Sequence, residues 1–217
     1  WKAGTTSGIA TNGSTTITPS AYSFNQTSGI SVIKYSGNSS AGAKVAHGLG
    51  TTPTMIMVKN LGGTDSWQIY HKHTAAKPED YLLQINTTGA AVDNNYFWYD
   101  TAPDDVNFTV GSDNGVNGSY DYVAYCFAEK TGYSKCGTFK GNNSSTDGTF
   151  VYTGFRPAFV LVKVTDYSAA WTLFDSSRLG YNLQNKVFTP NTGGAEYAAH
   201  WSDIYANGFK PFNNDPQ

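Results

Sequence analysis

The stretch PTMIMVK at residues 53–59 recurs as PAFVLVK at residues 157–163, and this pair decides the fold. The two copies are 104 residues apart, since 157 − 53 = 104. Two further pairs of blocks keep this spacing: YSGN at 35–38 with FKGN at 139–142, and WQIY at 67–70 with WTLF at 171–174. A constant spacing over three blocks indicates a tandem duplication rather than chance similarity.

Each copy reads as a β meander. A strand leads into a Gly/Ser/Asn turn, and Gly-x-x-Pro precedes an apolar strand, which is followed by a polar turn and an aromatic strand. Pro53 and Pro157 stand just before the apolar runs, where a missing N–H costs no ladder bond, so each run is predicted to be a central strand. We therefore predict an all-β fold of two tandem homologous units, with one helical turn at residues 77–80.

The predicted boundaries are an N-terminal extension at residues 1–29, a first unit at 30–130 and a second at 131–217. The first unit closes with the β-prone stretch YDYVAYCFA at 120–128, but the second unit has no counterpart before Gln217. An uncovered strand edge favours pairing with another chain. The open edge indicates truncation, a strand from residues 1–34 that fills the gap, or donation by a neighbouring chain. We expect a homo-oligomer.

Composition excludes some partners. The net charge is −2 and only 14% of residues are charged, which provides no basic field for nucleic acid. No apolar run approaches the roughly 20 residues of a membrane-spanning helix. The sequence starts at Trp1 without Met or a signal peptide, which we interpret as a fragment or a processed product. Cys126 and Cys136 suit either a hairpin-spanning disulfide or free thiols, and we favour free thiols.

Several blocks together resemble a two-repeat β-rich domain, itself without an assigned activity, of predicted tail-fibre and other virion proteins of marine phages. The blocks are WKAG at 1–4, HGLG at 47–50, the PTMIMVKN run at 53–60, residues 67–71, YVAYCFAE at 122–129, GFRP at 154–157 and NGFK at 207–210. That family is often grouped with concanavalin-like lectin and glucanase sandwiches. The resemblance therefore implies a jelly-roll-like β-sandwich on the virion surface, outside the cell, but no activity.

Catalysis has little support in the sequence. A glycosidase needs two facing carboxylates about 5 to 9.5 Å apart, and the best available pair is Asp121 and Glu129. No nucleophile motif and no phosphate-binding loop is present. We expect no catalytic residue, and a polysaccharide depolymerase remains the least favoured alternative.

Metal binding has two weak candidates. His71 and His73, as alternate strand residues, could bind a zinc or nickel ion with His47 or Asp65 as a further ligand. A loop with Asp113, Asn114 and Asn117 offers oxygen ligands suited to calcium, although an ordinary polar turn explains the same residues. We expect no cofactor, with calcium as the alternative at this loop.

Carbohydrate binding requires exposed aromatic faces together with polar side chains, usually on loops of a rigid sandwich. Two aromatic-rich stretches qualify and give the candidate ligand-binding residues Tyr96, Trp98, Tyr99, Asp100, Tyr197, His200 and Trp201. Because Trp98 and Trp201 recur between the units, both could instead be core residues. The hypotheses are a non-enzymatic virion module that contacts host glycans, or a structural module that contacts other virion proteins.

Overall fold

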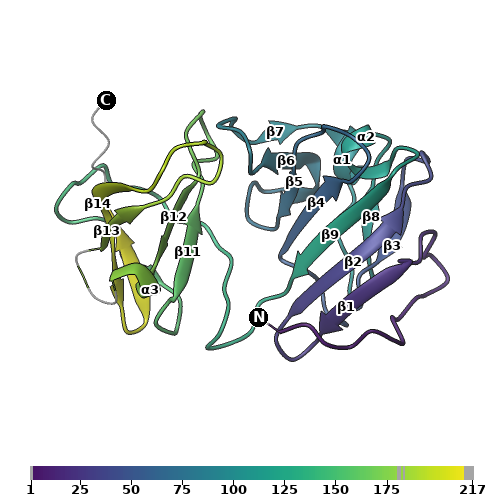
Figure 1. Ribbon diagram of the computed structural model, residues 1–217, viewed down its shortest axis with the longest axis horizontal. Coiled ribbons are helices and arrows are strands. Elements are labelled where there is room, and N and C mark those ends of the chain that lie inside the picture. The colour runs from purple at the N-terminus through teal and green to yellow at the C-terminus, as the bar shows by residue number, and fades with distance from the viewer. Residues whose placement is uncertain (1, 180–181, 183, 213–217) are drawn as a thin grey trace.

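The computed structural model describes residues 2–179, 182 and 184–212, which form two β lobes (Figure 1). We call residues 2–128 the first lobe and residues 136–212 the second lobe. The strands of the first lobe are β1 (Ala21–Asn25), β2 (Ile30–Ser36), β3 (Ala43–Ala46), β4 (Met55–Asn60), β5 (Gln68–His71), β6 (Tyr81–Gln84), β7 (Val92–Asp93), β8 (Asn107–Val110) and β9 (Asp121–Phe127). The strands of the second lobe are β10 (Val151–Tyr152), β11 (Phe159–Val162), β12 (Thr172–Asp175), β13 (Gln184–Val187), β14 (Tyr197–Tyr205) and β15 (Gly208–Pro211).

Helix in the described residues is confined to single turns. They are η1 (Pro78–Asp80), α1 (Asn95–Trp98), α2 (Asn114–Asn117) and α3 (Ser176–Leu179). The predicted all-β class is therefore confirmed, and η1 confirms the helical turn expected at residues 77–80. Within the described part of the chain, no helix has the length and apolar character needed to cross a membrane.

The first lobe has two layers of antiparallel strands. Seven strands form one sheet in the order β1-β2-β9-β4-β5-β6-β7, and β3 and β8 form a smaller second sheet. Tyr35, Ile56 and Tyr122 of the large sheet share one buried cluster with Val45 and Phe108 of the small sheet. Burial of apolar side chains between the two sheets is the main stabilising force of this lobe.

Strand β9 lies at the centre of the large sheet, where it pairs with β2 on one side and β4 on the other. The predicted strand at residues 120–128 is thus confirmed. Tyr122, Ala124 and Cys126 are fully buried on one face of β9, while Val123 and Tyr125 are half-buried on the other. This alternation follows the period of two that a strand imposes on its side chains.

Residues 2–34 are built into the first lobe. Strand β1 pairs with β2, Thr5 bridges to Phe24, and Ile17 joins the core. The alternative in which residues 1–34 supply a strand to the second unit is therefore wrong for the described residues 2–34. Their backbone and apolar groups are already engaged in the first lobe.

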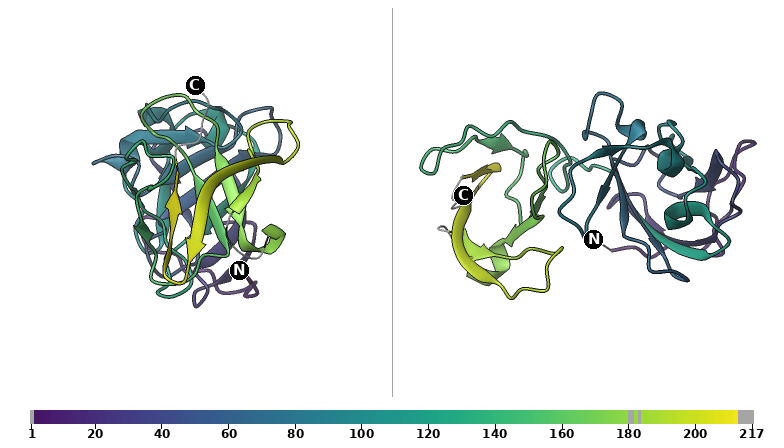
Figure 2. Two further views of the ribbon diagram at one scale, coloured as in Figure 1. Left: turned by 90° about the vertical axis from the view of Figure 1, so that its left-hand side faces the viewer. Right: turned by 90° about the horizontal axis from the view of Figure 1, so that it is seen from above.

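The second lobe is a sheet that curls around its own small core (Figure 2). Four strands are ordered β10-β15-β14-β13, β11 pairs with β12, and a bridge between Leu173 and Phe188 connects the two groups. Val160, Phe174, Ile204 and Phe209 form the buried cluster of this lobe.

The two lobes share the register of one hairpin. Met55 of β4 lies opposite His71 of β5, and Phe159 of β11 lies opposite Asp175 of β12, so both members of the pair are displaced by the same 104 residues. The strand expected before the second Gly/Ser/Asn turn, around Phe139, is not formed. The corresponding strand of the first lobe, β2, is paired with β9, whereas the described residues provide no strand neighbour for the segment around Phe139. This segment therefore lacks the backbone partner that a strand needs.

An apolar cluster joins the lobes. Ile69 and Leu83 of the first lobe pack with Trp171 of the second, and the Trp171 indole N–H donates to the carbonyl oxygen of Gln84 at 2.9 Å. Two backbone bonds lie beside this cluster, from Ala91 N to Thr165 O and from Ala169 N to Thr88 O, each 2.9 Å long. The lobes are therefore held by packing and hydrogen bonds as well as by the connecting chain.

Candidate functional site

The aromatic stretch of the first lobe forms the short helix α1 and the turn that follows it. The Asn94 side chain caps α1 by accepting a hydrogen bond from Tyr96 N at 3.0 Å. Tyr99 and Asp100 then take left-handed backbone conformations with φ of 53° and 45°. Phe97 and Trp98 are buried, whereas Tyr96 and Tyr99 on either side of them are 61% and 47% exposed.

Trp98, like Phe97, belongs to the buried core of the first lobe. Its ring is 1% exposed and packs edge-on against Tyr70, with ring centroids 6.0 Å apart. The indole nitrogen has no hydrogen-bond partner, so the contribution of this side chain is its packing. Trp98 is thus a core residue, and its buried ring offers no face to a ligand.

A glycine supports the exposed ring of Tyr99. Gly42 has φ of +80°, and a Cβ atom placed there would lie 3.0 Å from the nearest ring carbon of Tyr99. The ring therefore rests directly on the Gly42 backbone. Position 42 requires glycine both for its backbone conformation and for this contact.

A buried asparagine fixes the neighbouring loops. The Asn117 side chain accepts from Asn38 N at 2.9 Å and donates to Ser40 O and Gly111 O at 2.9 and 2.8 Å. The loop between β2 and β3 and the connection between β8 and β9 are thereby held together at one end of the first lobe. Tyr120, in the second of these, is 42% exposed. We call Tyr96, Tyr99 and Tyr120 the tyrosine rim.

The three residues considered as calcium ligands, Asp113, Asn114 and Asn117, make hydrogen bonds that hold these loops. Asp113 Oδ1 accepts from Gly115 N at 2.7 Å as the cap of α2, and the side chain of Asn117 is fully engaged as described above. Asn114 contributes its carbonyl oxygen, which accepts from the Tyr122 hydroxyl at 2.6 Å. In the part of the chain that the structure describes, no three His, Cys, Asp or Glu side chains form a metal-binding group.

The second predicted stretch, residues 197–201, lies in strand β14 rather than in a loop. Tyr197 is 39% exposed, whereas His200 and Trp201 are half-buried. His200 Nε2 lies 3.1 Å from Asp203 Oδ1, and its ring centroid is 4.8 Å from that of Phe212. This stretch and α1 belong to different lobes, so the structure does not bring the two predicted groups together (Figure 1).

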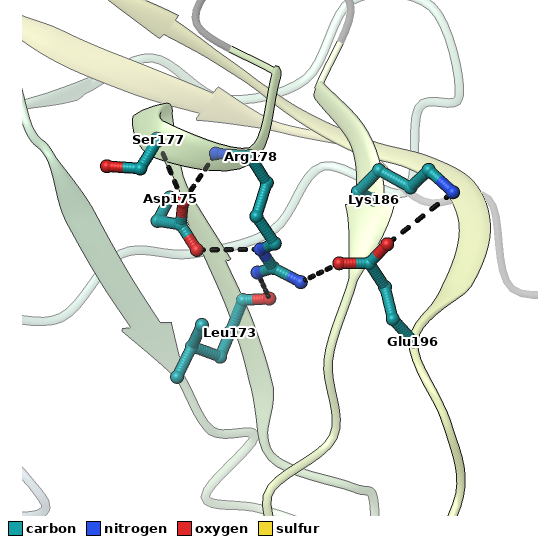
Figure 3. Close-up of polar contacts among 6 residues, drawn as sticks. All are labelled: Leu173, Asp175, Ser177, Arg178, Lys186 and Glu196. Carbon is teal, nitrogen blue, oxygen red and sulfur yellow. Dashed lines mark hydrogen bonds and ion pairs between the residues drawn. The ribbon is translucent and has the colours of Figure 1, made fainter.

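Sequence reasoning missed a network of charged side chains in the second lobe (Figure 3). Arg178 Nε lies 2.7 Å from Asp175 Oδ2, its Nη1 lies 2.5 Å from Glu196 Oε2, and Lys186 Nζ lies 3.5 Å from Glu196 Oε1. The Asp-x-x-Arg spacing was a readable signal for the first pair. No sequence signal pointed to Glu196, which is 18 residues from Arg178.

The network keeps both carboxylates ionised. Partial burial alone would raise the pKa of Asp175, but hydrogen bonds from Arg178 outweigh it and hold the pKa below the ordinary value. The hydrogen bond from Arg178 likewise lowers the pKa of Glu196. A general acid needs a raised pKa to carry its proton at neutral pH, so this pair acts as a clamp between β12, α3 and the chain before β14.

The carboxylates weighed for a depolymerase are far apart. Asp121 begins β9, and Glu129 follows its last residue, Phe127. The six residue steps from Asp121 to Phe127 span roughly 20 Å at about 3.3 Å each, and Glu129 lies two residues further along the chain. This separation exceeds the one that glycoside hydrolysis uses. Each also has a local partner, because Asp121 pairs with Lys34 at 2.8 Å and Glu129 accepts from Cys136 N at 2.8 Å. Asp121 and Glu129 therefore do not form the catalytic pair that was considered from the sequence.

The histidines considered for zinc have structural partners. The rings of His71 and His73 are 5.9 Å apart, and His73 N donates to His71 Nδ1 at 3.3 Å. His47 is buried, with Nε2 3.2 Å from Asp104 O and Nδ1 accepting from Leu49 N. Asp65 lies elsewhere, 2.7 Å from the Asn60 amide.

Both cysteines are free thiols, as the sequence interpretation favoured. Cys126 is buried in β9, and burial raises its pKa. The Cys136 sulfur accepts from the Thr54 hydroxyl at 3.4 Å, while burial raises the pKa of this thiol as well. Neither thiol is set up as a nucleophile.

With this geometry in place, the family assignment follows from sequence comparison. A family model described as "Domain of unknown function (DUF7483)" matches residues 1–217. The chain belongs to the DUF7483 family. No curated protein matched the chain, and no solved structure matched it. Membership in DUF7483 therefore covers the whole sequence and leaves the activity to be argued from the site itself.

Proposed function

We propose that this DUF7483 chain is a non-enzymatic module of a virion surface, such as a phage tail fibre, that contacts host glycans through the tyrosine rim. The observation that carries the proposal is the exposure of Tyr96 and Tyr99, at 61% and 47%, on a turn whose backbone is fixed by a cap and by Gly42. Exposed tyrosine rings on a rigid frame suit the apolar faces of sugar rings, since little conformational entropy is lost on binding.

Polar groups around the rim fit the same ligand class. Asp100 is exposed directly after Tyr99, and Ser39 and Ser119 lie 3.2 Å apart through their hydroxyl oxygens at the loop end that carries Tyr120. Carboxylate and hydroxyl groups can bind sugar hydroxyls while the rings cover the sugar faces. The resemblance to tail-fibre domains grouped with lectin-like sandwiches supports the location on a virion and the choice of a glycan.

A glycan array probed with the labelled 217-residue protein tests the proposal. We expect binding to a subset of bacterial surface glycans, and a loss of at least about tenfold in affinity, equivalent to about 1.4 kcal/mol, for Tyr96→Ala and for Tyr99→Ala. Tyr152→Ala is the matched control, because Tyr152 is 59% exposed but lies in the second lobe. Thermal unfolding of each variant establishes that the fold is retained.

Three results would count against glycan binding at the tyrosine rim. The rim is excluded if the double variant Tyr96→Ala/Tyr99→Ala binds as the unaltered protein does. Absence of binding to every glycan favours the second candidate, a structural module that contacts other virion proteins. Release of oligosaccharides from capsular polysaccharide would instead favour a depolymerase.

The structural module has one observation in its favour. Strand β11 pairs with β12 only, so in the described residues its other edge carries unpaired backbone groups. Such an edge is a template for pairing with another chain.

A further inference from the structure

The ring of Tyr120 lies against the backbones of two glycines from different loops. A Cβ atom placed on Gly62 would lie 2.8 Å from Tyr120 Cδ1, and one placed on Gly118 would lie 3.1 Å from Tyr120 Cδ2. Glycine at both positions lets the two loops approach opposite edges of one ring. Tyr120 is therefore held between the loops while it stays 42% exposed.

The side-chain amide of Asn114 lies against one of these glycines. A Cβ atom on Gly118 would collide with Asn114 Oδ1, so this amide and the Tyr120 ring meet over one backbone position. The Asn114 carbonyl oxygen accepts from the Tyr122 hydroxyl at 2.6 Å and from Asn60 Nδ2 at 3.0 Å, which fixes the backbone there. Asn114 is exposed, and its amide has no hydrogen-bond partner among the described residues. A free donor and a free acceptor thus stand beside an exposed ring.

Backbone contacts connect this pair of side chains to the other rings of the tyrosine rim. Asp113 N donates to Tyr96 O at 3.0 Å, and a Cβ atom on Gly111 would collide with the same carbonyl oxygen. Asn114 is the next residue after Asp113, so its position is fixed relative to the turn that carries Tyr96 and Tyr99. The Asn114 amide therefore belongs to the same rigid frame as the three rings.

The loops that carry or support the tyrosine rim contain acidic residues and no basic ones. These loops are residues 37–42, 61–67, 94–101 and 111–120, and their charged residues are Asp65, Asp100 and Asp113. Burial raises the pKa of the Tyr122 hydroxyl to about 12, and the negative charges of Asp65 and Asp113 act in the same direction. Both carboxylates therefore lie near the Asn114 carbonyl oxygen to which this hydroxyl donates.

These charges select against an acidic ligand. Lys59, directly before the loop 61–67, donates its Nζ to the carbonyl oxygen of Asp65 and is used within the frame. A carboxylate or phosphate brought to the rim would meet Asp100 and Asp113 without a basic loop side chain, and like charges that face each other cost affinity. A sugar hydroxyl meets no such penalty, because it can donate to and accept from a planar amide.

We propose that the glycan bound by the tyrosine rim is uncharged, with a sugar ring on Tyr120 and sugar hydroxyls on the Asn114 amide. The inference rests on the proposed glycan binding and adds to it the ligand class and a hydrogen-bonding residue. The ring covers the apolar side of the sugar, while the amide fixes its orientation.

Paired glycans test the charge of the ligand. Each neutral oligosaccharide on an array is printed beside the analogue in which the terminal hexose is replaced by the hexuronic acid, and the labelled 217-residue protein is applied. We expect the neutral member of each bound pair to bind at least about threefold more tightly at about 0.15 M salt. Asp100→Asn removes an exposed charge and is expected to narrow this difference. Salt at about 1 M should narrow it as well, because it screens the repulsion.

Asn114→Ala tests the hydrogen bonds. We expect this variant to bind the neutral glycan at least about fivefold more weakly, because the sugar hydroxyls lose a donor and an acceptor. Asn207→Ala is the control, since it removes an exposed amide of the second lobe and is expected to leave the affinity unchanged. Thermal unfolding gives the folded fraction of each variant, and the affinities are corrected for it.

Gly62→Ala tests the position of the Tyr120 ring while leaving Asn114 intact. The added Cβ atom must displace the ring, so we expect glycan binding to weaken at least about threefold. Gly13→Ala is the matched control, because no atom lies within 4 Å of a Cβ atom at that position, and it is expected to bind normally.

The outcomes distinguish failure of this inference from failure of the proposed function. Tighter binding of the hexuronic acid members overturns the inference, and so does unchanged binding by Asn114→Ala. In either case, glycan binding at the rim still stands if Tyr96→Ala and Tyr99→Ala lose affinity. Absence of binding to every glycan overturns both proposals.

Discussion

Two histidines of the first lobe are held neutral by their surroundings. Burial lowers the pKa of His47 and lowers that of His71 to about 4, with the neighbouring His73 acting in the same direction on His71. In the unfolded chain a histidine titrates near 6.5. The folded protein therefore binds fewer protons than the unfolded chain between about pH 6.5 and 4, and its stability falls as the pH drops through this range.

Removal of His71 is expected to flatten that dependence. A shift of the pKa from 6.5 to about 4 corresponds to at most about 3 kcal/mol of stability lost between pH 7 and 4. Urea unfolding of the unaltered protein and of His71→Gln over this range measures the difference in slope, and the carboxylates common to both proteins cancel. Identical slopes would show that His71 titrates normally in the folded protein.

At the level of single elements, β9 connects the sheet to the loops that carry the tyrosine rim. On its inner face the Tyr122 hydroxyl donates to Asn114 O at 2.6 Å and accepts from Gly118 N at 2.7 Å. On its outer face Tyr125 packs against Trp67, with ring centroids 6.1 Å apart. Two tyrosines of one strand therefore differ in whether the hydroxyl contributes to the fold.

Tyr122→Phe tests this difference. We expect a loss of about 1–2 kcal/mol in the free energy of unfolding, because the N–H of Gly118 loses its buried acceptor. Tyr125→Phe, in the same strand, is the control and is expected to change stability by less than about 0.5 kcal/mol. Guanidinium unfolding measures both variants, and equal losses would argue against a special role for the Tyr122 hydroxyl.

At the scale of the whole molecule, Trp171 couples the lobes. It occupies the position that Trp67 occupies in the first hairpin. Trp67 packs on Tyr125 of its own lobe, whereas Trp171 packs with Ile69 and Leu83 of the other lobe. Tryptophan at this hairpin position thus packs within one lobe in the first case and between the lobes in the second. The difference follows from which side chains lie next to each ring.

Trp171→Ala is expected to uncouple the lobes. Removing the ring and its bond to Gln84 should cost about 3–5 kcal/mol and divide calorimetric unfolding into two transitions. The second lobe should melt first, because its buried cluster is the smaller one. Trp67→Phe is the control and should leave the cooperativity unchanged. A single transition in Trp171→Ala would mean that the interface contributes little to coupling.

The sequence predicts the parts of this molecule that depend on local pattern. The apolar run at 53–59, the closing strand at 120–128 and the turn at 77–80 are all readable, because alternation and proline position are local properties. Side-chain directions that depend on tertiary contacts cannot be predicted from such local patterns. The recurrence of Trp98 and Trp201 between the units allowed a core position for Trp98. The adjacent aromatic residues at 96–99, however, did not show that Trp98 points inward while Tyr96 and Tyr99 point outward.

Long-range partners explain the other differences. The strand expected around Phe139 depends on a neighbour outside its own sequence, so local β propensity alone could not form it. The pairing of Arg178 with Glu196 depends on the path of the chain from β13 to β14. The tyrosine rim could not be predicted from the sequence either, because the position of Tyr120 in it depends on loops that the Asn117 side chain holds together.

The burial of Trp171 between the lobes gives the molecule an optical reporter. Its indole is 5% exposed, so separation of the lobes would move this fluorophore from an apolar setting into water. Trp98 would keep its buried environment during such a separation, since its cluster lies within the first lobe. A red shift of emission without loss of β circular dichroism would therefore register the lobes parting while each stays folded.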